Sequence, residues 1–137
     1  MVDFNGKSGI ALRRIVILSI LLLYFTVPHT LEDFATGEPG KAGIPAPAIS
    51  FVVSTIFSLQ ALGLYWLGQK KRRGLLAQAG VGLFWPLASA FAQLPSIINE
   101  RPYRSGFISV AYVVGIIVTG VLLFFFSLKA LLSIENK

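Results

Sequence analysis

Residues 106–128 read GFISVAYVVGIIVTGVLLFFFSL, a run of 23 residues that contains no charged side chain. A helix of about 20 predominantly apolar residues is long enough to cross the hydrocarbon core of a bilayer. Lys129 follows the run directly and marks its end. This segment therefore predicts a transmembrane helix.

Three more apolar runs lie earlier in the chain, at residues 14–31, 48–68 and 75–98. The first has an uninterrupted apolar core of only 13 residues, and reaches an adequate length by extension to Leu31. A signal peptide is the rival interpretation of this run, but the residues that follow its core fit a small-x-small cleavage site poorly. We therefore predict an all-α integral membrane bundle of four transmembrane helices, which forms a single domain over residues 1–137.

The composition agrees with a membrane protein and excludes several kinds of site. Hydrophobic residues make up 55% of the chain and charged residues 13%, against roughly 45–50% and about 25% in soluble domains. The absence of cysteine excludes disulfides, thiolate metal sites and iron–sulfur ligation. The single histidine, His29, excludes a bis-histidine haem within one chain. We expect no metal and no cofactor.

Lysine and arginine are distributed unevenly between the two sides of the predicted bundle. With outer loops at residues 32–47 and 99–105 and an inner loop at 69–74, nine of the 12 basic residues lie on the inner side and three on the outer side. The basic cluster at residues 70–73 is the strongest signal, because it lies in a short loop between two spans. We predict that both termini are cytoplasmic and that the protein lies in the cell (plasma or inner) membrane. The net charge of +6 is then an orientation signal, and we expect no nucleic-acid partner.

The most chemically suggestive residues are His29, Glu32 and Asp33. In a helix their spacing places all three on one face, where an imidazole and two carboxylates could relay a proton. With Glu100 of the other outer loop, they are the candidate catalytic residues. The rival interpretation is that Thr30-x-x-Asp33 starts a helix and that His29 lies at the headgroup level.

Arg101 and Arg104 lie in the other outer loop, on the same predicted side as Glu32 and Asp33. Opposite charges could pair across the two loops, which at a hydrated interface contributes only about 0–1 kcal/mol per pair. Alternatively, the two arginines bind an anion or a polar headgroup.

Uncharged polar residues form stripes along the predicted spans. One stripe on residues 75–98 contains Gln78, Gly82, Trp85, Ser89 and Gln93, and one on residues 48–68 contains Ser50, Ser54, Ser58, Ala61 and Tyr65. Their spacings of three and four place each set on a single helix face. The two interpretations are ordinary helix packing and a cavity for an apolar or amphipathic ligand. The candidate ligand-binding residues are Tyr65, Trp66, Gln78, Trp85, Ser89, Gln93, Arg101 and Arg104.

A row of small residues, Ala111, Gly115 and Thr119, lies on the fourth predicted span. Such rows let helix backbones approach closely. We therefore expect this row, besides the surrounding lipid, to contact either other helices of the chain, a partner membrane protein or a second copy.

Three functions fit these features. The first is a non-enzymatic accessory or interaction subunit of a membrane complex, because no charged side chain is expected at membrane depth and no catalytic set is assembled. The second is binding or transport of an uncharged or lipid-like molecule through a cavity lined by residues 75–98. The third is a membrane enzyme that acts at the outer face through His29 and the neighbouring acids. Ion-coupled transport is disfavoured, because proton relays use intramembrane Asp, Glu or His.

Overall fold

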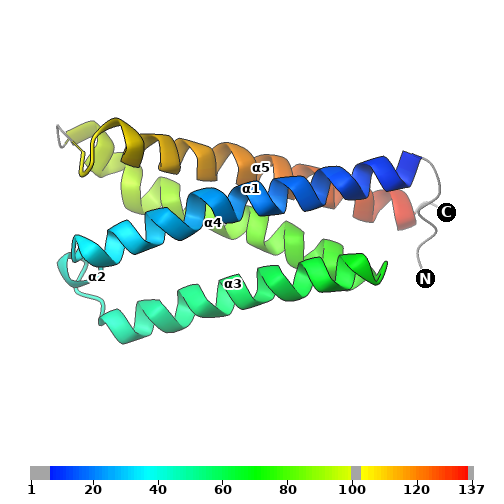
Figure 1. Cartoon of the computed structure of the whole chain (residues 1–137), viewed down its shortest axis with the longest axis horizontal. Helices are drawn as coiled ribbons and strands as arrows, with labels where there is room; N and C mark the ends of the chain where they lie inside the picture. Colours follow the sequence, from blue (N-terminus) through cyan, green and yellow to red (C-terminus); the bar gives the residue numbers. More distant parts are fainter. Residues whose placement is uncertain (1–6, 100–102, 136–137) are drawn as a thin grey trace.

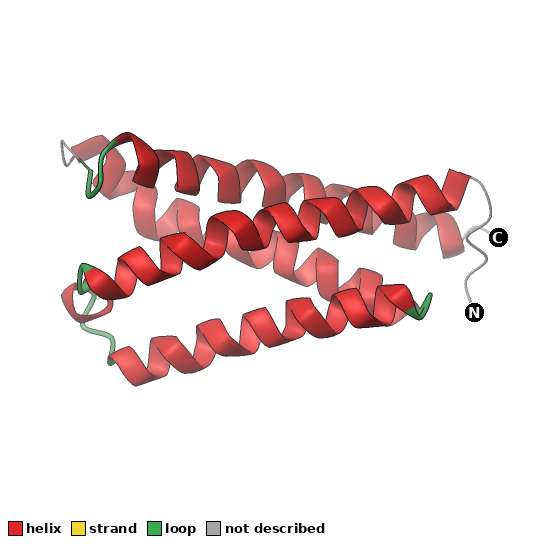
Figure 2. Cartoon of the chain, in the orientation of Figure 1, coloured by secondary structure: helices red, strands yellow, loops and turns green. Residues whose placement is uncertain are grey.

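The structure, a computed structural model, describes residues 7–99 and 103–135 and is helical with no strand in these ranges (Figures 1 and 2). The predicted all-α class is confirmed. The helices are α1 (Lys7–Ala35), α2 (Glu38–Lys41), α3 (Ala46–Gly68), α4 (Arg72–Asn99) and α5 (Phe107–Glu135).

Four of these helices are long and apolar enough to cross a membrane. The segments are Gly9–Ala35, Ala46–Gly68, Arg72–Asn99 and Phe107–Ile134. Within hydrocarbon, each backbone amide must be paired within the protein, and a helix pairs nearly all of its amides within one segment. The chain thus has the architecture of a multi-pass membrane protein.

All four long helices extend beyond the spans that the sequence predicts, and α1 and α5 do so by the most. α1 continues through Pro28 to Ala35, so the prediction that a helix begins at Thr30 is wrong. A proline within a membrane helix removes one backbone hydrogen bond, and the surrounding protein can compensate for it. α5 likewise continues past Lys129 to Glu135, because a helix need not end where it leaves the bilayer.

The connection between α1 and α3 is shorter than predicted and partly helical. It lies between Ala35 and Ala46 and contains α2, which begins after Gly37. Gly37 has a φ of 71°, which a glycine adopts without steric cost. The start of α1 and the end of α5 lie at one end of the bundle, and α2 lies at the other end (Figure 1).

α4 occupies the centre of the bundle, where it packs against α5 and α3, while α1 packs mainly on α5. The backbones of α4 and α5 touch at Gly82, where a Cβ atom would lie 2.6 Å from the Phe124 nitrogen. Near the start of α4, a Cβ atom on Gly74 would lie 2.6 Å from the Leu67 nitrogen of α3. Glycine at these two positions therefore fixes how closely the three helices approach.

α3 stays close to α4 near the short turn that joins them, and diverges from α4 towards the α2 end (Figure 1). Most of α3 is exposed, with only Gln60, Gly63 and Leu67 buried. The divergence leaves space between α1, α3 and α4, and the candidate site lies there.

Candidate binding pocket at the α2 end of the bundle

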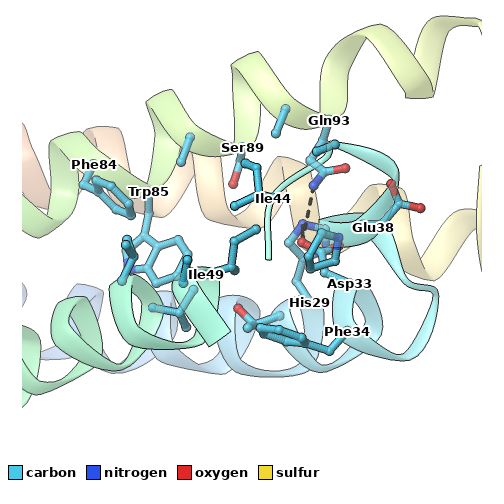
Figure 3. Close-up of a pocket in the computed structure, with 18 residues that line it drawn as sticks. His29, Asp33, Phe34, Glu38, Ile44, Ile49, Phe84, Trp85, Ser89 and Gln93 are labelled. Atoms are coloured by element: carbon cyan, nitrogen blue, oxygen red, sulfur yellow. Dashed lines mark hydrogen bonds and ion pairs between the residues drawn. The ribbon is translucent and has the colours of Figure 1, made fainter. Parts of the chain in front are cut away.

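A pocket of about 490 Å³ lies between α1, α3 and α4, next to α2 and the connection that follows it (Figure 3). Pockets of roughly 300–1,000 Å³ are typical of small-molecule sites. The residues that line it are His29, Thr30, Asp33, Phe34, Glu38, Pro39, Ala42, Ile44, Ala48, Ile49, Val52, Val53, Phe84, Trp85, Ala88, Ser89, Ala92 and Gln93.

The two ends of the pocket differ in chemistry. His29, Asp33 and Gln93 converge at one end, whereas Phe84 and Trp85 lie at the other end (Figure 3). Aliphatic side chains of α3 and alanines of α4 line the wall between the two ends. An apolar body and a polar head could therefore both find complementary surroundings in one pocket.

His29, Glu32 and Asp33 lie on one face near the end of α1, as their spacing predicts. The distance from His29 Nδ1 to Glu32 Oε2 is 3.9 Å, and that from His29 Nε2 to Asp33 Oδ2 is 3.7 Å. Both are longer than a hydrogen bond. Acidic groups at a helix C-terminus are disfavoured by the helix dipole, so the two carboxylates need partners from elsewhere.

Arg104 supplies the main partner. Its guanidinium pairs with Asp33 Oδ1 of α1, lies 3.4 Å from Glu38 Oε2 of α2, and donates to Gln93 Oε1 of α4 at 2.7 Å. The side chain is only 6% exposed, although the residue lies in a loop. Its backbone adopts a φ of 42°. One of the pairs that the sequence allowed between the two predicted loops, Arg104 with Asp33, is thus present. The Arg104 clamp, as we call this group of contacts, ties α1, α2 and α4 together.

Gln93 is held in one orientation by two donors on the same oxygen. The Tyr103 hydroxyl donates to Gln93 Oε1 at 2.6 Å, beside the Arg104 contact, while Gln93 Nε2 lies 3.4 Å from Asp33 Oδ2. Burial raises the pKa of Tyr103 to about 12. The hydroxyl therefore remains protonated at neutral pH and can act as the donor.

Glu32 connects α1 to the start of α5. Its Oε1 accepts hydrogen bonds from the hydroxyls of Ser105, at 2.6 Å, and Ser109. A carboxylate is also favoured near the first turn of a helix, where the backbone dipole is positive. Glu32 thus stabilises the entry of the chain into α5, and does not line the pocket.

Two nitrogen atoms on pocket-lining residues are buried without a hydrogen-bond partner. They are Nδ1 of His29, a residue that is 4% exposed, and Nε1 of Trp85, a residue that is 6% exposed. Most buried polar atoms in folded proteins are paired. These two atoms therefore stand out as potential ligand contacts.

The candidate ligand-binding residues divide into two groups. Trp85, Ser89 and Gln93 line the pocket. Three others do not line it. Gln78 is buried nearer the start of α4, and Tyr65 is 61% exposed. The Trp66 ring lies 4.7 Å from the Arg73 guanidinium carbon. Of the remaining ligand-binding candidates, Arg104 acts through the clamp and Arg101 lies outside the described residues, as does the catalytic candidate Glu100.

Several contacts were not anticipated from the sequence. Gln60 Nε2 donates to the Ser19 carbonyl and hydroxyl oxygens at 2.9 and 3.0 Å, and Gln78 Nε2 donates to the Gln60 carbonyl at 3.0 Å. The position of Gln60 on a different helix face from Ser58 was the available signal. Glu38 was missed as a partner of Arg104, because the connection that carries it had no helical periodicity.

The small row on α5 makes contacts within the chain. A Cβ atom on Gly115 would lie 2.6 Å from the Phe25 ring of α1, and Thr119 is buried. Contact of this row with a second chain stays a prediction.

Within residues 7–99 and 103–135, no group of three or more His, Cys, Asp and Glu side chains is arranged to hold a metal ion. No protein family model matches the chain, and comparison with curated proteins and with solved structures found no significant match.

Proposed function

We propose that the protein binds an uncharged, lipid-like amphipathic molecule in the pocket between α1, α3 and α4. The observation that carries this proposal is the change in chemistry along the pocket, from His29 and Asp33 at one end to Phe84 and Trp85 at the other. The apolar part of the ligand lies against α3 and α4, and its head lies near the Arg104 clamp.

The position of the pocket supports access from the membrane. α3 forms one wall of the pocket and is largely exposed along its length, including Val52 at 47%. A molecule dissolved in the bilayer could therefore enter beside α3 without crossing the water phase. Transport is an extension of this proposal, and requires movement of the ligand from the pocket to another compartment.

Binding can be measured with hexadecanol, a long-chain alcohol that resembles the expected ligand in having one polar end. The purified protein in nanodiscs should bind labelled hexadecanol saturably, and the ligand should raise its melting temperature. An Ala88→Trp variant places a large side chain in the pocket and should lower the affinity by more than about tenfold, equivalent to 1.4 kcal/mol.

Leu87→Trp provides the matched control. Leu87 is adjacent to Ala88 on α4, does not line the pocket and is 47% exposed. This variant should bind hexadecanol as the wild type does. Equal binding by the wild type and Ala88→Trp would overturn the proposal, because it would show that the alcohol merely partitions into the surrounding lipid.

The orientation and the cell-membrane location belong to the proposal as well. The head of the ligand faces outwards if both termini are cytoplasmic. Gly40→Cys and Gly68→Cys are suitable test variants, since a Cβ atom at either position meets nothing within 4 Å. An impermeant thiol reagent should label Gly40→Cys from outside intact cells and leave Gly68→Cys unlabelled, and the reverse result would overturn the orientation.

The accessory-subunit and enzyme interpretations remain predictions. For the enzyme, the Asp33 and Glu32 carboxylates are already engaged by Arg104 and by two serines. This arrangement favours a structural role for the acids over a catalytic one. We therefore rank binding first.

A further inference from the structure

The polar group that lies furthest along α4 from the head end of the pocket is the indole of Trp85. The side chain packs against two phenylalanine rings, with centroid distances of 5.2 Å to Phe57 and 5.4 Å to Phe84. The residue is 6% exposed, and its Nε1 has no hydrogen-bond partner. A buried indole N–H normally finds an acceptor.

We infer that the ligand of this pocket carries two oxygen functions, a hydroxyl head and a second oxygen in its apolar part that accepts a hydrogen bond from Trp85 Nε1. This inference rests on the proposed function and specifies the chemical class of its ligand. The indole nitrogen can only donate, so a hydrocarbon chain or an ammonium group leaves it unpaired. A carbonyl, ether or hydroxyl oxygen satisfies it.

The helix geometry sets the spacing of the two oxygen functions. Trp85 and Gln93 both line the pocket and are separated by eight residues on α4. At a rise of about 1.5 Å per residue, this separation corresponds to roughly 12 Å along the helix axis. The second oxygen therefore lies well inside the apolar part of the ligand, further from the head than the ester groups that directly follow a glycerol head.

The head end of the pocket favours a donor over an anion. Asp33 and Glu38 line this end, and Arg104, which pairs with both, is not among the lining residues. A hydroxyl can donate to a carboxylate or to His29, whereas a phosphate or carboxylate head would face a like charge. The ligand class is thus an uncharged long-chain or ring-containing alcohol with an internal oxygen.

A pair of probes tests the second oxygen directly. The first probe is hexadecanol, and the second is the same alcohol with a ketone roughly 12 Å from the hydroxyl along the extended chain. The wild-type protein in nanodiscs should bind the keto-alcohol about tenfold more tightly than hexadecanol. In Trp85→Phe, which keeps an aromatic ring but lacks the N–H, the two probes should bind within about twofold of each other.

Trp66→Phe is the matched control, because Trp66 lies outside the pocket against Arg73. This variant should retain the tenfold preference. It also leaves Trp85 as the sole tryptophan of the chain, so the fluorescence of this residue can be followed alone. A hydrogen bond to the indole N–H shifts its emission to the red, and the keto-alcohol should cause this shift while hexadecanol does not.

The outcomes separate this inference from the function on which it rests. If hexadecanol binds saturably but the ketone gives neither tighter binding nor a red shift, the inference is wrong and the binding function stands. If Trp85→Phe keeps the preference, another group recognises the ketone, and the assignment to Trp85 is wrong. If neither probe binds saturably, both the function and the inference are wrong.

Discussion

The polar stripes of α3 and α4 have the same helical spacing and opposite surroundings. On α4, Gln78, Gly82, Trp85, Ser89 and Gln93 are all buried, whereas on α3, Ser50, Ser54, Ser58, Ala61 and Tyr65 are all exposed. A glutamine at membrane depth needs partners from other helices, because its amide has two donors and an acceptor. A serine or threonine can donate to a carbonyl of its own helix, as exposed Thr55 does to Phe51 at 2.8 Å. Spacing therefore identifies a face, and glutamine side chains, which need several hydrogen-bond partners, indicate that the face must be covered.

The largest effect should come from the α4 stripe at Gly82. In Gly82→Leu, the new side chain would meet the α5 backbone, since even a Cβ atom lies 2.6 Å from the Phe124 nitrogen and 2.9 Å from the Gly120 oxygen. We expect a loss of about 3 kcal/mol or more in the free energy of unfolding, measured by denaturant titration in mixed micelles. Gly80→Leu is the control, because a Cβ atom there meets nothing within 4 Å, and a similar loss in both variants would contradict the α4–α5 contact.

Breaking the Arg104 clamp should have the next largest effect. Arg104→Ala leaves Asp33 and Glu38 without a buried cation, and removal of one partner from a largely buried pair costs about 2–3 kcal/mol after allowance for the partial exposure of Asp33. Lys41→Ala removes an exposed partner of Glu38, with a side chain that is 66% exposed, and should cost less than about 0.5 kcal/mol. Thermal unfolding of the two variants side by side would show whether the clamp, and not simply a positive charge near Glu38, holds this end of the bundle.

Much of the fold was predictable because long apolar runs permit one solution in a bilayer. The i, i+3, i+4 spacing of His29, Glu32 and Asp33 likewise predicted their common face. The pocket was predictable only in part, from Trp85, Ser89 and Gln93. Its other walls depend on the divergence of α3, which follows from tertiary packing and leaves no periodic signal in the sequence.

The partners of the acids were predictable to different degrees. Opposite charge suggested that Arg101 or Arg104 could meet Glu32 or Asp33, since all four were expected on one side of the membrane, and the structure contains the Arg104–Asp33 pair. The contacts of Glu32 with Ser105 and Ser109 had no such signal, because serine is common in loops and at helix starts. Glu38, which contacts Arg104, lies in α2. This helix has only four residues and is too short to show a helical periodicity in the sequence.

A smaller, pH-dependent effect should come from Tyr103, which supports Gln93 at the α2 end of the α4 stripe. Tyr103→Phe removes one buried hydrogen bond and should cost about 1 kcal/mol at pH 8. The pKa of Tyr103 is raised from 10.0 to about 12, so the folded state favours the protonated phenol. Its contribution is fully present below pH 10 and is lost as the pH rises towards 12. The stability difference between wild type and variant should therefore shrink over that range, and a constant difference would show that the phenol is not buried.

The smallest effects compare the two stripes directly. Gln78→Leu removes the hydrogen bond to the Gln60 carbonyl and should lower the free energy of unfolding by about 1 kcal/mol, within the range measured for buried hydrogen bonds between membrane helices. Ser54→Leu exchanges one exposed polar side chain for an apolar one and should change stability by less than about 0.5 kcal/mol. Both variants can be followed by the same denaturant titration. If Ser54→Leu lost as much free energy of unfolding as Gln78→Leu, the α3 stripe would have to be covered in the membrane. The helices described in the structure leave this stripe exposed, so the covering surface would have to come from another molecule.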